Sequence, residues 1–183
     1  MTQLRVEIIP CAQMTAEDER AIARLCAAAW PDPADPFSAD DLAHAHGGTH
    51  LVVRDARGAI RSHAAIVPRR IWVGEVPLPA GYLEAVATDP VHRGRGYASA
   101  ILARAGERIR TGDDLGLLSG EGRSLYRRHG WEPWTGPSLV RGPGGVRPTP
   151  GEDGGIQLLR TDRVRWVRGD EPIACEERAG DPW

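Results

Sequence analysis

Apolar residues recur along the chain with the two periods that distinguish strands from helices. Short apolar runs predict strands at residues 6–9, 50–53, 59–73, 76–88, 115–118, 131 onward, 156–160 and 164–167. Helical spacing and end signals predict helices at residues 15–30, 38–47, 97–110 and 122–129. The glycine- and proline-rich segment 142–155 is predicted to be a loop. Neither a repeat nor a linker interrupts this order, which predicts one α/β (α+β) domain over residues 1–183.

The most distinctive stretch joins a strand, a glycine-rich turn and a helix. Leu83–Thr88 is an apolar strand that contains one carboxylate, Glu84, and the sequence Arg93-Gly94-Arg95-Gly96 follows it into a helical run. A glycine-rich turn before a helix offers backbone N–H groups and a partial positive charge to a phosphate. The spacing is neither G-x-G-x-x-G nor G-K-[ST]. The stretch is therefore a candidate phosphate-binding loop, and the alternative is an ordinary strand-to-helix turn.

Charge and cysteine content narrow the classes of partner and compartment. A net charge of −2 argues against nucleic acid or an anionic membrane as the main partner. No apolar run is long enough to span a bilayer, and the N-terminus lacks a signal pattern. The three cysteines are widely spaced and describe neither a disulfide framework nor a zinc site. We expect a cytoplasmic globular protein, and whether it forms a homodimer stays open.

Several segments resemble the GCN5-related N-acetyltransferases (GNAT). Arg93–Ala98 is similar to the R-G-x-G-x-A loop of that family, and Ser124–Trp131 resembles its second motif. Gly81–Ala87, Trp131–Pro137 and Arg178–Trp183 resemble the aminoglycoside 2'-N-acetyltransferases. The resemblance covers nearly the whole chain from about residue 35. It implies the GNAT fold, with a mixed, curved and splayed central sheet flanked by helices. It also implies transfer of an acetyl group from acetyl-CoA to the 2'-amine of a small-molecule aminoglycoside.

The resemblance also implies which residues bind acetyl-CoA. Val86, Ala87 and Thr88 would pair through their backbone with the pantetheine arm, as a neighbouring strand would. The pyrophosphate would lie against the loop residues Arg93, Gly94, Arg95, Gly96, Tyr97 and Ala98. No metal ion is implied.

Two residues carry the chemistry that the resemblance implies. Glu84 would assist deprotonation of the attacking amine through a water molecule, and Tyr126 would protonate the departing thiolate. A primary ammonium must lose a proton before it attacks a thioester, so the reaction needs a base. Acidic residues are depleted within apolar strands, which favours a functional role for Glu84 over that of an exposed strand residue. For Tyr126, the alternative is core packing with a satisfied hydroxyl group.

The resemblance further implies a polar pocket for a polycationic sugar. Its residues would be Asp35, Asp41, Glu84, Ala85, Ser119, Glu152, Asp153, Asp181 and Trp183, the last with its terminal carboxylate. Asp41 is equally suited to cap a helix, because it lies three residues after Ser38. Singly, such loop acids commonly face solvent; together they would attract a polycation. At position 85 the subfamily often has glycine, whereas this chain has alanine.

Tryptophans are expected to anchor the fold. Core positions are predicted for Trp30, Trp131, Trp134 and Trp166. Chain ends ordinarily fray, but Pro182 stiffens the approach to Trp183. The tail is therefore expected to dock through Trp183.

Three alternatives to this function remain on the sequence alone. His44, His46 and His50 invite a metal site, but a helix-to-strand break separates them. The same chemistry could act on another amine, such as kasugamycin (an atypical aminoglycoside), a polyamine or a protein N-terminus. The fold could also serve as a non-catalytic acyl-CoA-binding sensor, against which the presence of both Glu84 and Tyr126 counts.

Overall fold

The computed structural model describes residues 4–34, 36–120 and 122–183. Contacts between residues divide the chain into two compact units, one of residues 1–67 and 83–105 and the other of residues 68–82 and 106–183. Strands β3 (Ile60–Val73) and β4 (Val76–Thr88) and helix α3 (Tyr97–Gly112) contribute to both units. The extent of the domain, residues 1–183, stays a prediction.

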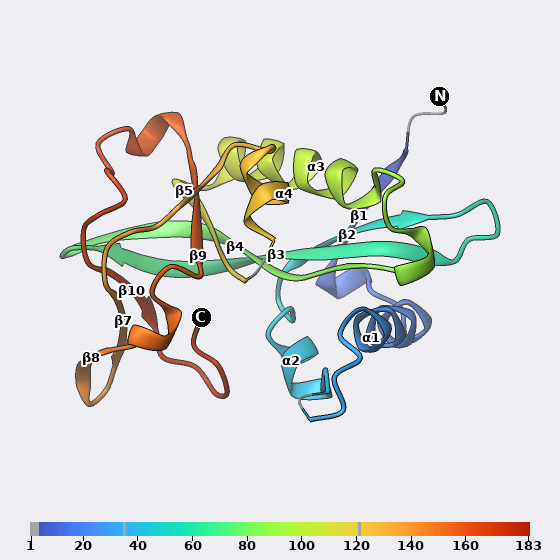
Figure 1. Ribbon diagram of the computed structural model, residues 1–183, viewed down its shortest axis with the longest axis horizontal. Coiled ribbons are helices and arrows are strands. Elements are labelled where there is room, and N and C mark those ends of the chain that lie inside the picture. The colour runs from blue at the N-terminus through green and yellow to red at the C-terminus, as the bar shows by residue number, and fades with distance from the viewer. Residues whose placement is uncertain (1–3, 35, 121) are drawn as a thin grey trace. The chain divides into compact units, whose positions relative to one another are not determined.

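The first unit is an antiparallel set of strands with helices on both faces (Figure 1). β1 (Val6–Pro10) pairs with β2 (Thr49–Arg54), and β2 pairs with the first half of β3. Helices α1 (Ala16–Ala29) and α2 (Ala39–Ala43) lie on one face of β2 and β3, and the first half of α3 lies on the other. Short 3-10 turns at Cys11–Gln13 and Pro90–His92 complete the unit.

Side-chain caps set where the helices of this unit begin. The Asp18 N–H donates to Thr15 Oγ1 at 3.1 Å, so α1 starts after Thr15 as predicted. Ser38 and Asp41 form a reciprocal capping box on α2. The core between these helices and the strands includes Ile22, Leu25, Cys26, Leu42, Val52, Ala65 and Val67.

In the second unit the strands follow the order β6-β9-β5-β4-β3-β10-β7-β8. Pairing is parallel between β4 and β5 and between β7 and β10, and antiparallel elsewhere along this order where the register is defined. Helix α4 (Arg123–Arg127) and 3-10 turns at Pro150–Glu152 and Asp162–Val164 connect them. The strands are β5 (Leu115–Ser119), β6 (Trp131–Pro133), β7 (Ser138–Gly142), β8 (Gly145–Pro148), β9 (Ile156–Arg160) and β10 (Ile173–Glu176).

Four sequence predictions about the second unit and the tryptophans are corrected. The predicted loop 142–155 contains β8, which forms a hairpin with β7, and a 3-10 turn. The predicted strand 164–167 is wrong, since Val164 ends a 3-10 turn. Val164 and Val167 are both buried, and a spacing of three residues places two side chains on one side of a turn, whereas in a strand they would point to opposite faces. Strand β10 was not predicted. Trp131 and Trp134 are in the core, whereas Trp30 and Trp166 are exposed.

Candidate active site

The glycine-rich turn before α3 has the conformation and exposure that a phosphate loop requires. Gly94 and Gly96 have φ of 75° and 82°, values that glycine adopts without steric cost. Both are exposed, and a Cβ built on either would meet no atom within 4 Å among the described residues. Arg93 is partly engaged, since its guanidinium donates to the Ala29 carbonyl at 3.1 Å. Arg95, also exposed, precedes Gly96 at the start of α3.

The end of β4 is irregular where the predicted base lies. Glu84, Ala85 and Val86 are all half-buried, which breaks the alternation of a regular strand. Ala85 has φ of 49°, a left-handed conformation that costs a non-glycine residue roughly 1–2 kcal/mol. Such a residue inside a strand is typical of a β-bulge, which turns side chains and backbone groups away from the ladder. Further along, the carbonyl of Ala87 already accepts from Ser62 Oγ at 2.9 Å.

Two buried histidines lie behind this irregularity. His63 Nδ1 is 2.9 Å from the carbonyl oxygen of Ala85, and His63 Nε2 is 2.9 Å from His50 Nδ1. The two residues are 0% and 3% exposed. Burial lowers the pKa of His63 to about 3 and also lowers the pKa of His50, so both rings are neutral near pH 7.

Acid is expected to destabilise the protein through His63. The folded state keeps this ring neutral down to about pH 3, whereas the unfolded chain takes up a proton near pH 6.5. The unfolded state therefore binds more protons in this window, and the free energy of unfolding falls as the pH drops through it. Urea denaturation at a series of pH values measures this slope, which should be shallower in His63→Leu. An identical slope in the variant would contradict a neutral, buried His63.

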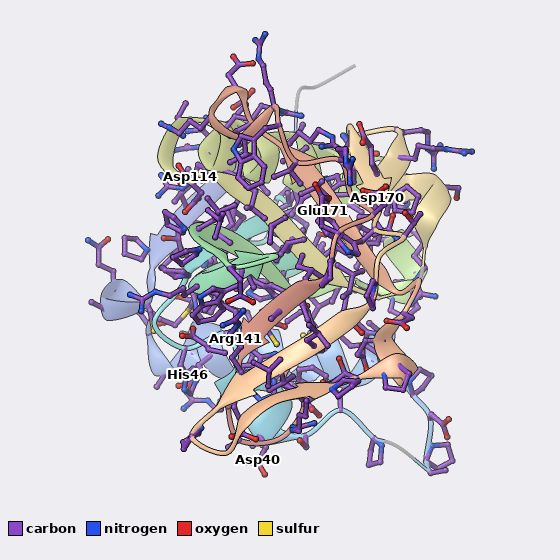
Figure 2. The ribbon with its side chains drawn as sticks, turned by 90° about the vertical axis from the view of Figure 1, so that its left-hand side faces the viewer. Asp40, His46, Asp114, Arg141, Asp170 and Glu171 are labelled. Atoms are coloured by element: carbon purple, nitrogen blue, oxygen red, sulfur yellow. The ribbon has the colours of Figure 1, made fainter. Side chains whose placement is uncertain are left out.

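His46 belongs to the set His44, His46 and His50 that the sequence offers as an alternative metal site, and it has an acidic partner. His46 (Figure 2) lies on the segment between α2 and β2. Its Nε2 is 3.3 Å from Glu19 Oε1 on α1. His46 and His50 both line a cavity of about 300 Å³ beside α1. Within the described part of the chain, no group of three or more His, Cys, Asp or Glu side chains is arranged to hold a metal ion.

Tyr126, the predicted proton donor, lies in the second unit on α4. The residue is 8% exposed, and its ring meets the ring of Trp131 edge-on, with centroids 6.4 Å apart. Burial raises the pKa of its hydroxyl group above the ordinary value of 10, so the group keeps its proton at neutral pH. Both the donor role and the core-packing alternative are compatible with this position.

The predicted pocket residues of the second unit are connected by hydrogen bonds. Trp183 Nε1 donates to Thr149 Oγ1 at 3.0 Å, and Thr149 Oγ1 donates to Ser138 Oγ at 3.0 Å. Asp153 accepts from Ser138 Oγ at 2.7 Å and from its N–H at 2.8 Å. These bonds from Ser138 hold the pKa of Asp153 below its usual value. Asp153 is thus bound to the start of β7.

Glu152 and Asp181 are placed differently from Asp153. Glu152 accepts from Ser119 Oγ at 3.0 Å, which joins two predicted pocket residues directly. Asp181 is exposed, and its carboxylate accepts from the Trp183 N–H at 3.0 Å. Trp183 itself is 4% exposed, so the prediction that the tail docks through this residue is confirmed. Glu152 and Asp181 thus each accept a hydrogen bond that ties the carboxylate to another residue of the second unit, Ser119 for Glu152 and Trp183 for Asp181.

Asp41 and Asp35 complete the predicted pocket. The Asp41 carboxylate accepts from the Ser38 N–H at 2.7 Å and from Ser38 Oγ at 2.8 Å, so its capping role is confirmed. Its role in a pocket stays a prediction. Asp35 lies outside the described residues.

Sequence reasoning missed Thr149 and Ser138, and it did not single out His63 or the conformation of Ala85. Thr and Ser are common in turns and strands and carry no signal of a network. An alanine at position 85 gives no sign of positive φ, which a glycine there would have suggested.

Comparison with known proteins establishes the family. A model of the acetyltransferase (GNAT) domain matches residues 11–134. The chain is 38% identical, over 151 residues, to the aminoglycoside 2'-N-acetyltransferase of Mycolicibacterium fortuitum. That alignment covers 80% of this chain and 77% of the relative. The chain belongs to the GNAT acetyltransferase family, and both the resemblance seen in its sequence and its predicted fold class are confirmed.

Solved structures show the same fold. The GNAT protein YhbS of Escherichia coli, in complex with CoA, has a TM-score of 0.65 at 20% identity, covering 98% of this chain and 96% of that one. A probable N-acyltransferase of Enterococcus faecalis has a TM-score of 0.58 at 20% identity. The latter match covers 74% of this chain and 34% of that one, so this chain spans about a third of that protein. Among the described helices, none is long and apolar enough to cross a membrane.

Proposed function

We propose that the protein transfers the acetyl group of acetyl-CoA to the 2'-amine of an aminoglycoside. The observation that carries the proposal is the 38% identity to an enzyme of that name over 80% of this chain. The exposed glycine loop at the start of α3 supports the use of acetyl-CoA, because its conformation suits a pyrophosphate. E. coli YhbS, which has the same fold, was solved with CoA.

The chemistry needs one base and one acid. In the proposed reaction, Glu84 takes a proton from the substrate ammonium through a water molecule, which frees the amine lone pair. The amine then attacks the thioester carbonyl, an N–C bond forms and the C–S bond breaks. Tyr126 gives its proton to the departing CoA thiolate, and its raised pKa keeps that proton available at neutral pH. The nitrogen releases its second proton to solvent, from which Tyr126 is afterwards reprotonated. The transfer is direct, and no cysteine carries the acetyl group.

Acceptor recognition is assigned to carboxylates. Aminoglycosides carry several ammonium groups, and charge-assisted hydrogen bonds to carboxylates are stronger than neutral ones. Glu152, held by Ser119, and Asp181, held against Trp183, are the acids of the second unit whose geometry fits this role. Asp153 contributes less, because Ser138 occupies one of its oxygens twice. Asp41 is the candidate in the first unit and is comparable to Asp153, because Ser38 likewise occupies one of its oxygens twice.

A turnover assay with acetyl-CoA tests the proposal. Release of CoA should be seen with aminoglycosides that have a free 2'-amine and should be absent with those that lack one. Turnover only with polyamines, peptides or atypical aminoglycosides such as kasugamycin would show the same chemistry on another amine. Acetyl-CoA binding without turnover on any amine would support the sensor alternative instead.

Replacing Gly96 with valine is expected to weaken acetyl-CoA binding. A side chain at this position would block the approach of the pyrophosphate and would strain a residue with φ of 82°. Gly58 is a matched control, since it also has φ of 82° and no atom within 4 Å of a built Cβ among the described residues. Calorimetry should therefore show lower acetyl-CoA affinity in Gly96→Val than in Gly58→Val. Equal affinities in two folded variants would argue against the phosphate loop.

A further inference from the structure

The backbone at Ala85 has an unfavourable conformation and meets a side chain from a neighbouring strand. Among the described residues, Ala85 is the only non-glycine residue with positive φ, at 49°. It directly follows Glu84 and directly precedes the strand residues assigned to the pantetheine arm. Its carbonyl oxygen lies 2.9 Å from His63 Nδ1, on β3. A strained residue persists only where its surroundings determine its conformation. Around Ala85 these include the contact with His63 and the packing of the residue against the core of the first unit.

The contact also determines where the protons lie on both histidine rings. A carbonyl oxygen can only accept, so His63 Nδ1 carries a proton and donates to Ala85. Because His63 is buried and neutral, its Nε2 has no proton and accepts from His50 Nδ1, 2.9 Å away. His50 is therefore protonated at Nδ1 and, being neutral, bare at Nε2. Only one tautomer of each ring allows both hydrogen bonds, from His50 to His63 and from His63 to Ala85.

Strand register explains how the two rings meet. In the β2–β3 ladder Val52 is opposite His63 and His50 is opposite Ala65, so the two histidines are diagonal neighbours on one face. Both residues are buried, and His50 also lines the cavity of about 300 Å³ beside α1.

The pair can hold the Ala85 carbonyl, which an apolar pair could not. His63 Nδ1 lies 2.9 Å from this oxygen, and a leucine or valine side chain has no hydrogen-bond donor.

We propose that His63 is a positioning residue that holds the Ala85 peptide group in its left-handed conformation, and that His50 fixes the tautomer of His63. The bulge then directs the Glu84 side chain and sets the backbone of Val86–Thr88 for the pantetheine arm. This inference rests on the proposed acetyl-CoA site. His63 and His50 do not themselves touch a reacting atom.

Two replacements of His63 distinguish the effect of its hydrogen-bond donor from the effect of its volume. Asparagine places an amide nitrogen where Nδ1 stood and can still donate to Ala85, whereas leucine has a similar shape and no donor. The dissociation constant of acetyl-CoA, measured by calorimetry, should rise about tenfold in His63→Leu and stay within about threefold of wild type in His63→Asn. kcat/KM for the active amine should follow the same order.

A second test changes residue 85 instead of the ring. Glycine adopts positive φ without the Cβ strain of alanine, so a glycine at position 85 needs less help from His63. The loss caused by His63→Leu should therefore be smaller in an Ala85→Gly background. Equal losses in both backgrounds, or an asparagine variant as weak as the leucine variant, would overturn the proposal.

Ring spectra of the wild-type protein keep the proposal testable if the leucine variant fails to fold. Nitrogen-15 NMR of labelled histidines should show both rings neutral and protonated at Nδ1 at neutral pH. Protonation of His63 at Nε2 would overturn the inference. If wild type binds acetyl-CoA but acetylates no amine, the proposed function fails while the affinity comparison still decides the role of His63. A wild type that does not bind acetyl-CoA would overturn both.

Discussion

Replacing Glu84 with glutamine is expected to lower kcat on the order of 10²-fold at neutral pH. The amide cannot take a proton from the substrate ammonium, and at neutral pH most of the acceptor amine is protonated. At alkaline pH the free amine is already abundant, so the loss should shrink. Rates measured from neutral to alkaline pH check this difference, with acetyl-CoA affinity expected to stay near that of wild type.

Glu75→Gln is the matched control for this experiment. Glu75 lies in the turn just before β4, its side chain is 88% exposed, and it pairs with Arg141. The variant makes the same change in charge and size outside the proposed site, and its turnover should match wild type. A loss in Glu84→Gln that is equal at every pH would point to a positional role for Glu84 instead of a base.

Strong local patterns allowed much of the fold to be predicted. Strands β3 and β4 are long, largely apolar stretches, and α3 has apolar residues at helical spacing. Thr15, Ser38 and Pro31 mark helix ends by side-chain or backbone chemistry. The exceptions lack such a pattern. β8 is exposed along its whole length, so it contributes no apolar alternation. β10 is only four residues long and owes its place between β3 and β7 to tertiary pairing.

In the candidate site, too, local sequence patterns could be predicted and tertiary contacts could not. The loop Arg93–Gly96 was predictable because glycine and arginine have few other reasons to alternate before a helix. The role proposed for His63 was not, because it depends on a diagonal partner thirteen residues away, His50, and on the conformation of Ala85. Likewise, Asp153 could be named as an acid in a turn, but only the structure shows that Ser138 takes up its oxygen.

Replacing Trp183 with alanine is expected to destabilise the protein by about 3–5 kcal/mol. The side chain is buried in the core of the second unit, and its Nε1–H donates to Thr149. Arg178 holds the same segment by donating to the backbone oxygens of Asp181 and Trp183 at 2.7 and 3.0 Å. Thermal unfolding should register the loss, at roughly 2–4 °C per kcal/mol for a chain of this size.

Trp166→Ala is the control for the loss of a large aromatic side chain. Trp166 is 50% exposed, against 4% for Trp183, so its removal should change stability little. Similar melting temperatures for both variants would mean that the tail is not docked in solution.

Because Trp183 is part of the core, deleting residues 180–183 would lower the stability of the protein as well as remove Asp181. A change in substrate binding could then not be assigned to Asp181. Asp181→Asn avoids this, since the amide oxygen can still accept from the Trp183 N–H while the negative charge is lost. If Asp181 binds an ammonium group, this variant should raise the aminoglycoside KM several-fold and leave kcat and the melting temperature near wild type. The control is Asp170→Asn, which makes the same charge change outside the predicted pocket. Asp170 (Figure 2) is an exposed acid of the same unit that pairs with Arg168. An unchanged KM in Asp181→Asn would remove Asp181 from the acceptor site and leave Glu152 as the candidate carboxylate of this unit.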